Sequence, residues 1–376
     1  MLKILCDQQL VNAQEAFSPI GAVVTKNGRE IRASDLEDVD ALIVRSVTRV
    51  DRELLQDARR LVFVGTATSG IDHIDTQYLA ERKIHFATSK GCNCESVADY
   101  VLSVMLLSPF DELSAFEKRS IGIIGCGNVG GQVELRARGL GMTIKKCDPL
   151  RYGSGDETCN AEFEEALSCD FVTLHVPLTM EDPYKTYHMI DGNALNKLKA
   201  QCCLINASRG PVVDNNALLD FLRRRRDVKA YLDVFEWEPD IPNVELLRNL
   251  KGASPHIAGY ALEAKKRSCI TLAQRLDEYL GLHAIDPNYD RADVMETISL
   301  APDYVFSLPV IRNLCRCVYD VREDFDMFRL SFTGPESFDD MRKNYRVRHE
   351  LQSMRVANVR PEDVERFRLL GFDVKG

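Results

Sequence analysis

The sequence predicts an α/β protein with two doubly wound parallel-sheet domains and a smaller C-terminal α+β domain. Short β-branched apolar runs alternate with amphipathic stretches, this pattern starts a second time near Ser120, and it changes after Asp286. The length of 376 residues is too great for one ordinary core and indicates two or three domains. A composition with 45% hydrophobic and 28% charged residues excludes extensive disorder and a fibrous class.

The first α/β domain begins at the start of the chain. Its predicted strands are four apolar runs separated by amphipathic stretches, at residues 2–5, 41–44, 61–64 and 84–86. Strands of a parallel sheet are covered on both faces and are therefore apolar along their whole length. We expect these four runs to form one such sheet.

The second α/β domain follows a predicted helix over residues 95–107, in which Val97, Val101, Met105 and Leu106 recur at helical spacing. The predicted strands of this domain lie at residues 121–124, 143–144, 171–174, 204–205 and 231–234. Their alternation with helical spacers predicts a second parallel sheet.

The third domain is predicted beyond Asp286, where segments rich in aromatic residues and arginine replace the alternating pattern. Candidate strands there are Phe328–Ser331 and Met354–Ala357. The mixture indicates a small α+β domain.

The net charge of −9 disfavours a nucleic-acid or membrane-surface role, because a polyanionic partner would be repelled. The most basic run, Arg223–Arg226, follows apolar residues and is predicted to end a surface helix, where cations complement the C-terminal dipole. No apolar run approaches the roughly 18 residues that span a bilayer. The start of the chain turns polar at Cys6, too early for a signal peptide, so a cytoplasmic protein is expected.

The 12 cysteines are scattered along the chain, and many lie in apolar, strand-like runs. We therefore expect reduced, buried thiols and no disulfide framework. The two C-x-C pairs, Cys92 with Cys94 and Cys315 with Cys317, lack the spacing of a structural zinc site. No metal site is expected.

A glycine motif, Gly125-Cys126-Gly127-Asn128-Val129-Gly130, follows a predicted strand and opens a predicted helix. In that context it predicts a dinucleotide site, with pyrophosphate at the helix N-terminus. Asp148 ends the next strand, where its carboxylate accepts ribose hydroxyls and repels a 2′-phosphate. NAD is therefore expected over NADP. The alternative is a glycine-rich turn that binds nothing.

Three charged residues follow predicted strands, where open α/β sheets place their ligands: Arg209, Glu238 and His256. The pKa of free histidine suits His256 to act as a base for a hydroxyl proton, and Glu238 would orient its ring. Arg209 offers a planar donor fork for a carboxylate. Taken singly, each has an ordinary structural explanation, as a loop ion pair, a solvated turn acid or a satisfied loop histidine.

Together with the glycine motif, these clusters resemble the D-2-hydroxyacid dehydrogenase family over roughly residues 1–285. The resemblance implies a flavodoxin-like substrate-binding domain, formed by residues 1–93 and 257–285, and a Rossmann NAD-binding domain, formed by residues 94–256. It also implies that Arg209 binds the substrate and that Glu238 pairs with His256, the acid/base.

The same resemblance implies further contacts with NAD. Asp233 matches the aspartate that holds the nicotinamide amide, and His175–Leu178 matches a loop beside the adenosine. The implied cofactor-binding residues are Gly125, Gly127, Asn128, Val129, Gly130, Asp148, Val176, Ala207, Ser208, Arg209, Asp233 and Gly259.

Other stretches resemble one branch of this family, which carries a dimerisation domain of its own. They are residues 44–48, 65–70, 91–93, 183–186, 256–260, 318–322 and 338–345. Residues 286–376 are therefore expected to form that domain and to make the chain a homodimer. The branch also implies that Ser46, Thr68 and Tyr260 contact the substrate.

The branch implies a phosphorylated D-2-hydroxy acid as the substrate, and a phosphate calls for basic donors. Arg45, Arg346 and Arg348 are unranked candidates for that task. Two alternatives remain open: a different phosphorylated substrate, such as 3-phosphoglycerate, and an NAD-sensing regulatory protein of the same fold. A metabolite-sensing role is the alternative for the C-terminal domain.

Overall fold

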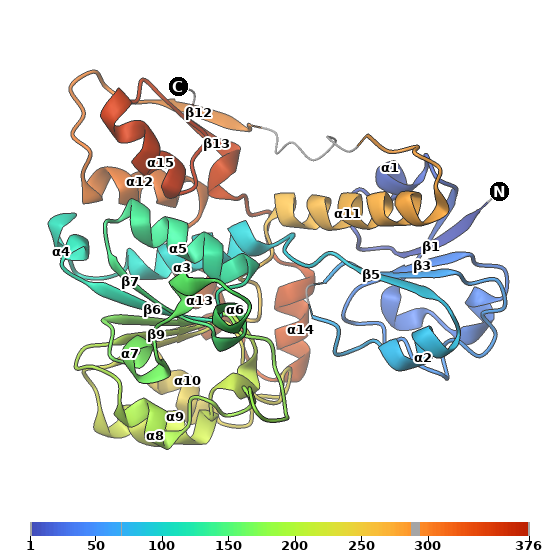
Figure 1. The fold of residues 1–376 in the computed structure, drawn as a ribbon, viewed down its shortest axis with the longest axis horizontal. Coiled ribbons are helices and arrows are strands. Elements are labelled where there is room, and N and C mark those ends of the chain that lie inside the picture. Colours follow the sequence, from blue (N-terminus) through green and yellow to red (C-terminus); the bar gives the residue numbers. More distant parts are fainter. Residues whose placement is uncertain (1, 69, 287–293, 375–376) are drawn as a thin grey trace. The chain divides into compact units, whose positions relative to one another are not determined.

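The computed structural model describes the whole chain except residues 1, 69, 287–293 and 375–376. Its contacts divide the chain into two compact units (Figure 1). The first unit comprises Met1–Asn93 and Ala261–Ala292, and the second comprises Cys94–Tyr260 and Asp293–Gly376. The C-terminal region thus belongs to the same compact unit as the predicted NAD-binding region, while the division into three domains stays a prediction.

The first unit contains a five-stranded parallel sheet of order β2-β1-β3-β4-β5, the flavodoxin-like arrangement. Its strands are β1 Lys3–Asp7, β2 Ala22–Lys26, β3 Ala41–Val44, β4 Phe63–Thr66 and β5 His85–Thr88. Its helices are α1 Ala13–Phe17, α2 Thr76–Glu81 and α11 Leu262–Leu280. Alternate strand residues fill two cores, so that Ile43 packs with Leu272 of α11 and Leu42 packs with Leu79 of α2.

The second unit contains a six-stranded parallel sheet of order β11-β10-β9-β8-β6-β7. Its strands are β6 Ser120–Ile124, β7 Thr143–Cys147, β8 Phe171–Leu174, β9 Cys203–Asn206, β10 Lys229–Leu232 and β11 Gly252–Ala253. The strand order reverses at β6. The next strand of the chain, β7, lies on one side of β6, and the later strands, β8 to β11, lie on its other side. This doubly wound order, with the parallel sheets of both units, confirms the predicted fold class.

Helices cover both faces of the second sheet (Figure 1). One face packs against α3 Cys94–Met105 and α5 Asn128–Gly139, and α3 confirms the helix predicted over residues 95–107. The other face packs against α7 Phe163–Leu167, α8 Gly192–Asn196, α9 Asn215–Arg224 and α10 Val244–Asn249. Two short helices, α4 Ser114–Glu117 and α6 Pro149–Gly153, lie between strands. Helix α9 ends within the basic run, as predicted.

The C-terminal region is a small α+β arrangement. It consists of β12 Glu296–Ser299, β13 Met354–Ala357, α12 Leu308–Val318, α13 Val321–Ser331, α14 Pro335–Lys343 and α15 Val364–Leu369. The prediction of a strand at Phe328–Ser331 was wrong, because these residues end α13. Val321, Phe325 and Phe328 recur at helical spacing and are buried on one face of that helix. The strand predicted at Met354–Ala357 is confirmed as β13, paired with β12.

All 12 cysteines lie in the described residues and are free thiols, and ten of them are buried. Burial raises the pKa of several, including Cys203 to about 12. No helix among the described residues is long and apolar enough to cross a membrane.

Candidate active site

The glycine motif forms the turn between β6 and α5. Gly125 has φ +88°, and an added Cβ would lie 2.7 Å from the backbone carbonyl of His175. A Cβ on Gly130 would lie 2.1 Å from the Gly125 oxygen, whereas a Cβ on Gly127, at the N-cap of α5, would meet no protein atom within 4 Å. The first and third glycines are thus required by packing. The open space beside Gly127 fits a diphosphate at the N-terminus of α5.

Asp148 directly follows β7 and faces this turn. Its Oδ2 accepts the Cys126 N–H at 2.8 Å, and its Oδ1 accepts the Arg151 N–H at 3.1 Å as the N-cap of α6. A carboxylate has about four lone-pair positions, so acceptor capacity remains for two ribose hydroxyls. The position therefore fits the adenosine ribose of NAD.

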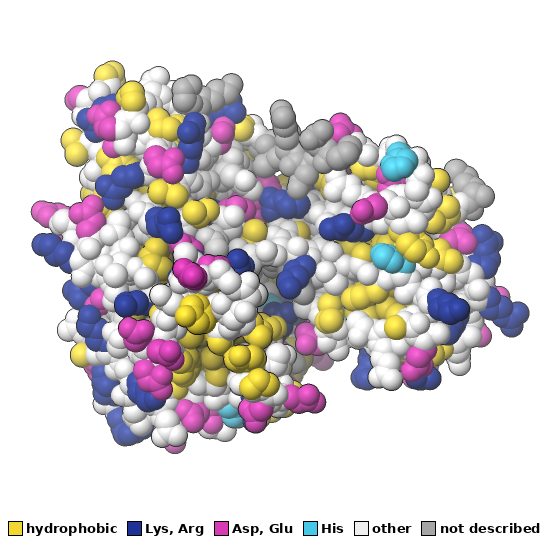
Figure 2. All heavy atoms as spheres, viewed as in Figure 1, with side chains coloured by type: hydrophobic (Ala, Val, Ile, Leu, Met, Phe, Trp, Pro, Cys, Tyr) yellow, Lys and Arg dark blue, Asp and Glu magenta, His cyan; other side chains and the backbone are white. Residues whose placement is uncertain are grey.

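Helix α6 exposes apolar side chains next to Asp148. Leu150 is 62% exposed and Tyr152 is 54% exposed. Figure 2 shows hydrophobic side chains gathered on this face of the second unit, around the place that α6 occupies in Figure 1. An apolar surface beside a ribose-binding carboxylate fits an adenine ring. The sequence interpretation assigned no role to either residue.

The loop from His175 to Leu178 follows β8 and lies against the glycine turn, since Val176 would be 2.9 Å from a Cβ on Gly125. The Nε2 atom of His175 shares a hydrogen bond of 2.9 Å with Thr173 Oγ1. Its Nδ1 atom is buried and has no hydrogen-bond partner. Burial lowers the pKa of His175 to about 3, so the ring is neutral and serves packing.

Asp233 follows β10 and ties two loops together. Its Oδ1 accepts hydrogen bonds from Ser254 Oγ at 2.6 Å and from the Ile257 N–H at 2.9 Å, and its Oδ2 accepts the Ala258 N–H at 2.8 Å. Burial raises its pKa to about 6, against the opposing effects of His256 and these donors. Through these hydrogen bonds Asp233 fixes the loop that carries His256.

His256 and Glu238 form a hydrogen-bonded pair, with Nδ1 and Oε2 2.7 Å apart. The other carboxylate oxygen of Glu238 accepts the Phe235 N–H at 2.6 Å. Burial raises the pKa of Glu238, but the charge and hydrogen bond of His256 outweigh it and hold the pKa below its usual range. The Nε2 atom of His256 has no hydrogen-bond partner among the described residues, so it is available to a ligand.

Arg209 lies in the loop after β9. Asn206 holds this loop, because its amide donates to the Arg209 carbonyl at 3.0 Å and its oxygen accepts the Ser208 N–H at 3.1 Å. A Cβ on Gly210 would lie 1.9 Å from the Phe235 carbonyl oxygen, so the Arg209 and Glu238 loops are in direct contact. The neighbouring strands β9, β10 and β11 thus bring the three predicted catalytic residues to one edge of the sheet.

The predicted substrate contacts divide between the two units. Ser46 and Thr68 belong to the first unit, where the Thr68 hydroxyl bonds Thr66 Oγ1 at 2.8 Å and the Gly70 carbonyl at 2.7 Å. Tyr260 belongs to the second unit and directly follows Gly259. The contacts of Ser46, Thr68 and Tyr260 with the substrate stay predictions, and so does the contact of Gly259 with the cofactor.

All three candidate phosphate ligands already have protein partners. Arg45 pairs with Asp7 at 3.0 Å, and Arg346 pairs with Glu323 at 3.1 Å. Arg348 is only 1% exposed and donates to backbone carbonyls. A different basic residue, Arg342, donates to the Tyr260 hydroxyl at 2.9 Å. Its signal was the segment 338–345, which had contributed to the resemblance without assigning Arg342 a role.

A second histidine–carboxylate group contains Glu236, which lies two residues before Glu238 in the same loop. His188 Nε2 is 2.6 Å from Glu236 Oε1, and its Nδ1 is 3.7 Å from Asp214 Oδ2. The three side chains place potential metal-ligand atoms within 4.8 Å of one another. Glu236 also accepts the Asn215 N–H at 2.9 Å and Asp214 caps α9, so direct hydrogen bonds explain the arrangement. The sequence held no local signal for it.

Two family descriptions match the chain. Residues 109–258 match the NAD-binding domain of the D-isomer-specific 2-hydroxyacid dehydrogenases, and residues 294–371 match a domain of unknown function, DUF3410. Erythronate-4-phosphate dehydrogenase of Aeromonas salmonicida is 41% identical, with 100% of both chains covered. The enzyme of the same name from Tolumonas auensis is 38% identical over 100% of both chains.

Solved structures resemble about three quarters of the chain. NAD⁺-bound 3-phosphoglycerate dehydrogenase of Entamoeba histolytica is 25% identical, with 75% of this chain and 96% of the other covered at a TM-score of 0.64. D-lactate dehydrogenase of Aquifex aeolicus, solved with NAD and lactic acid, is 24% identical, with 75% and 97% covered at a TM-score of 0.60. These likenesses agree with the doubly wound fold of both sheets.

Proposed function

Because the chain belongs to the erythronate-4-phosphate dehydrogenases, a branch of the D-2-hydroxyacid dehydrogenases, we propose that Arg209, Glu238 and His256 catalyse the oxidation of 4-phospho-D-erythronate. The chain is an NAD-dependent oxidoreductase of pyridoxal 5′-phosphate (vitamin B6) biosynthesis. The product is (R)-3-hydroxy-2-oxo-4-phosphooxybutanoate. The catalytic assignment rests on the Glu238–His256 pair. The pair leaves the Nε2 atom of His256 available at the carboxyl edge of the sheet.

His256 serves as the base. Its Nδ1 hydrogen bond to Glu238 fixes the ring and leaves Nε2 to take the proton of the substrate hydroxyl. The imidazolium that forms is stabilised by the ionised Glu238, whose lowered pKa keeps it charged. In the reverse direction the same Nε2 returns the proton to the carbonyl oxygen.

Arg209 serves as the substrate's cation. Its planar guanidinium binds the carboxylate of a 2-hydroxy acid with two parallel hydrogen bonds, and it polarises the carbonyl in the reverse reaction. The contact between Gly210 and the Phe235 carbonyl sets the Arg209 loop against the loop of the base. His256, which accepts the proton, and Arg209, which donates hydrogen bonds to the substrate carboxylate, are thereby held at the same edge of the sheet.

NAD, when bound, accepts the hydride from the carbon that carries the hydroxyl. The residues proposed to hold it are the glycine turn, for the diphosphate, and Asp148, for the ribose. Asp233 is proposed to accept a hydrogen bond from the nicotinamide amide. The negative charge of Asp148 favours NAD over NADP.

The test of this function is a comparison of substrates followed by the absorbance of reduced nicotinamide. We expect kcat/KM for 4-phospho-D-erythronate to exceed that for 3-phosphoglycerate by about 10²-fold or more. Equal values would refute the substrate assignment, and NAD binding without turnover of either acid would favour a regulatory protein. The full-length match to erythronate-4-phosphate dehydrogenases disfavours both alternatives.

We further propose that the chain forms a homodimer through its C-terminal region. That region exposes large apolar side chains, with Leu330 83% exposed and Val347 69% exposed. Sedimentation of the full chain should give a dimer that Leu330→Asp weakens, and a monomer at micromolar concentration would contradict the proposal.

The 12 free thiols support a reducing, cytoplasmic location.

A further inference from the structure

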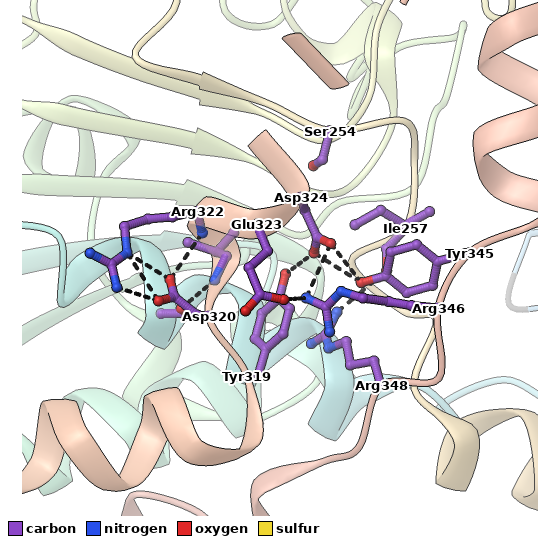
Figure 3. Close-up of polar contacts among 12 residues, drawn as sticks. Ser254, Ile257, Tyr319, Asp320, Arg322, Glu323, Asp324, Tyr345, Arg346 and Arg348 are labelled. Carbon is purple, nitrogen blue, oxygen red and sulfur yellow. Dashed lines mark hydrogen bonds and ion pairs between the residues drawn. The ribbon is translucent and has the colours of Figure 1, made fainter. Parts of the chain in front are cut away.

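The C-terminal region reaches the catalytic loop of its own chain. Arg348 donates from Nη1 to the Ala258 carbonyl at 3.0 Å and from Nη2 to the Ser96 carbonyl at 2.6 Å. Its guanidinium lies 3.5 Å from the centre of the Tyr319 ring. Figure 3 shows Arg348 beside Tyr319 and below Ile257, the residue that follows His256. The His256 loop is therefore clamped from two sides, at its N–H groups by Asp233 and at its carbonyls by Arg348.

Asp324 of α13 anchors the segment that carries Arg348 (Figure 3). Its Oδ2 accepts the Tyr319 hydroxyl at 2.7 Å and the Tyr345 hydroxyl at 2.9 Å. Arg346 adds a contact with Asp324 at 3.4 Å. These bonds fix residues 345–348, which begin two residues after the end of α14, against the rest of the unit. The chain that leaves the C-terminal end of α14 is thus held by ordered structure.

Arg342, near the end of α14, contacts Tyr260, which lies four residues after His256. Its Nη2 donates to the Tyr260 hydroxyl at 2.9 Å, and its guanidinium carbon lies 5.6 Å from the Tyr260 ring centre and 5.9 Å from that of Phe338. Its Nε is buried and has no hydrogen-bond partner. Among the described residues, no carboxylate lies within ion-pair distance of this cation.

The positive charge of Arg342 acts on Glu238. After the larger effects of burial, His256 and the Phe235 N–H, Arg342 contributes to the lowered pKa of Glu238. Charged and titratable groups from several elements interact here: Arg342 acts on Glu238, Asp233 interacts with His256, and Asp339 and Tyr260 interact with Arg342. A positive charge that acts on a carboxylate favours its ionised form, and Arg342 acts on Glu238 in that direction without a direct ion pair.

We propose that Arg342 is a positioning residue for the oxidation, which fixes the phenol of Tyr260 and supplies positive charge beside the Glu238–His256 pair. The proposal rests on the function proposed for that pair. It gives the C-terminal region a part in the chemistry of its own chain, in addition to any part in assembly.

The test compares Arg342→Met with Arg342→Lys, with Tyr260→Phe and with the control Lys343→Met. Lys343 is the next residue of α14 and is exposed. Loss of the charge makes the pair easier to protonate, so Arg342→Met should move the acid limb of kcat/KM to higher pH by roughly 0.5–1 unit. It should also lower kcat about tenfold. Arg342→Lys should restore the acid limb to its pH in the parent protein. Tyr260→Phe should lower kcat without moving the acid limb. Lys343→Met should match the parent protein in both measurements.

An unmoved limb in folded Arg342→Met, or a limb that lysine does not restore, would overturn the proposal. If Arg342→Met does not fold, Arg342→Gln gives the same readout, because it also removes the charge. NMR titration of the His256 ring in the protein without substrate provides the same comparison independently of turnover. A shifted titration in a protein that oxidises no 4-phospho-D-erythronate would refute the proposed substrate and leave the role of Arg342 intact.

Discussion

Two histidine–glutamate pairs meet in the loop after β10, and they differ in what surrounds them. Glu238 pairs with His256 at 2.7 Å, and Glu236 pairs with His188 at 2.6 Å. In the second pair both ring nitrogens face carboxylates, and Glu236 also accepts the first N–H of α9. In the first pair one ring nitrogen is left available. Bond length alone therefore does not mark a catalytic pair; the unused atom does.

The difference arises from the direction in which alternate residues of one loop point. Glu236 turns to the start of α9, where it is 3% exposed and completes the packing. Glu238, two residues later, turns to the loop after β11. Because β10 and β11 are neighbours in the sheet, that loop lies at the edge where parallel sheets bind ligands. The sharpest tests change corresponding residues of the two pairs.

The largest effect is expected from removing the two imidazoles. His256→Ala should lower kcat by about 10³-fold or more, because the substrate proton loses its acceptor, and NAD affinity should remain nearly unchanged. His188→Ala should leave kcat of the folded protein within about twofold and lower the free energy of unfolding by about 1–3 kcal/mol, because the buried Glu236 loses the partner of its Oε1 and keeps only the Asn215 N–H. Steady-state kinetics and chemical denaturation measure both. A catalytic loss in the His188 variant as large as in the His256 variant would break the distinction.

The two carboxylates give the next largest effect. Glu238→Gln keeps the size of the side chain but not the charge that stabilises the imidazolium, so kcat should fall about 10²-fold. Glu236→Gln should cost about 1–2 kcal/mol of stability at unchanged kcat, because the amide satisfies its partners incompletely. If the two effects were exchanged, Glu236 would be the catalytic partner.

The glycine turn repeats this contrast between packing and chemistry. Gly127→Ala places a methyl group where no protein atom lies within 4 Å, so the protein should keep its melting temperature while its Kd for NAD rises about tenfold. Gly125→Ala forces a side chain into a residue with φ +88°, and should cost about 1–3 kcal/mol of stability. Titration with NAD and thermal melting separate the two outcomes. Unchanged NAD affinity in Gly127→Ala would place the diphosphate elsewhere.

The smallest effect concerns an acid at the opposite edge of the sheet, where no chemistry is expected. Burial raises the pKa of Asp170, but hydrogen bonds from Lys199, Ser120 and Arg119 outweigh it and lower the pKa to about 2. Asp170→Asn should cost about 1 kcal/mol of stability at neutral pH, a value reduced by the exposure of its basic partners, and leave kcat unchanged.

This contribution is present above the unfolded pKa of about 3.9 and is lost as the pH falls towards 2. The stabilities of the Asp170→Asn variant and of the parent protein should therefore converge as the pH falls to about 2. Denaturation curves at several pH values measure this. A difference that persists at low pH would assign the effect to packing.

The sequence could predict the catalytic edge because strand ends are local signals. Arg209 and Asp233 follow apolar residues of their strands, and parallel strands carry such residues to a common edge. The strands β2 and β12 were missed, because both are largely exposed and so lack a continuous apolar run. The buried β11 was missed as well, because it is only two residues long, Gly252–Ala253. Helix α13 was mistaken for a strand because a short apolar segment fits either period.

Contacts between distant segments left no local signal. Arg342 meets Tyr260 across 82 residues, and Arg348 meets Ala258 across 90. The pairing of His188 with Glu236 spans 48 residues and joins two loops that no periodicity connects. The pairing of Glu238 with His256 was predicted, whereas the pairing of His188 with Glu236 is seen only in the folded chain.

The most direct test of the account is the pH dependence of a single turnover in protein saturated with NAD and mixed rapidly with 4-phospho-D-erythronate. If His256 takes the hydroxyl proton, the parent protein should form NADH more slowly as the pH falls below neutrality. The His256→Ala variant should keep only a slow residual rate without that limb. A fast rate with the same acid limb in the variant would show that another group is the base.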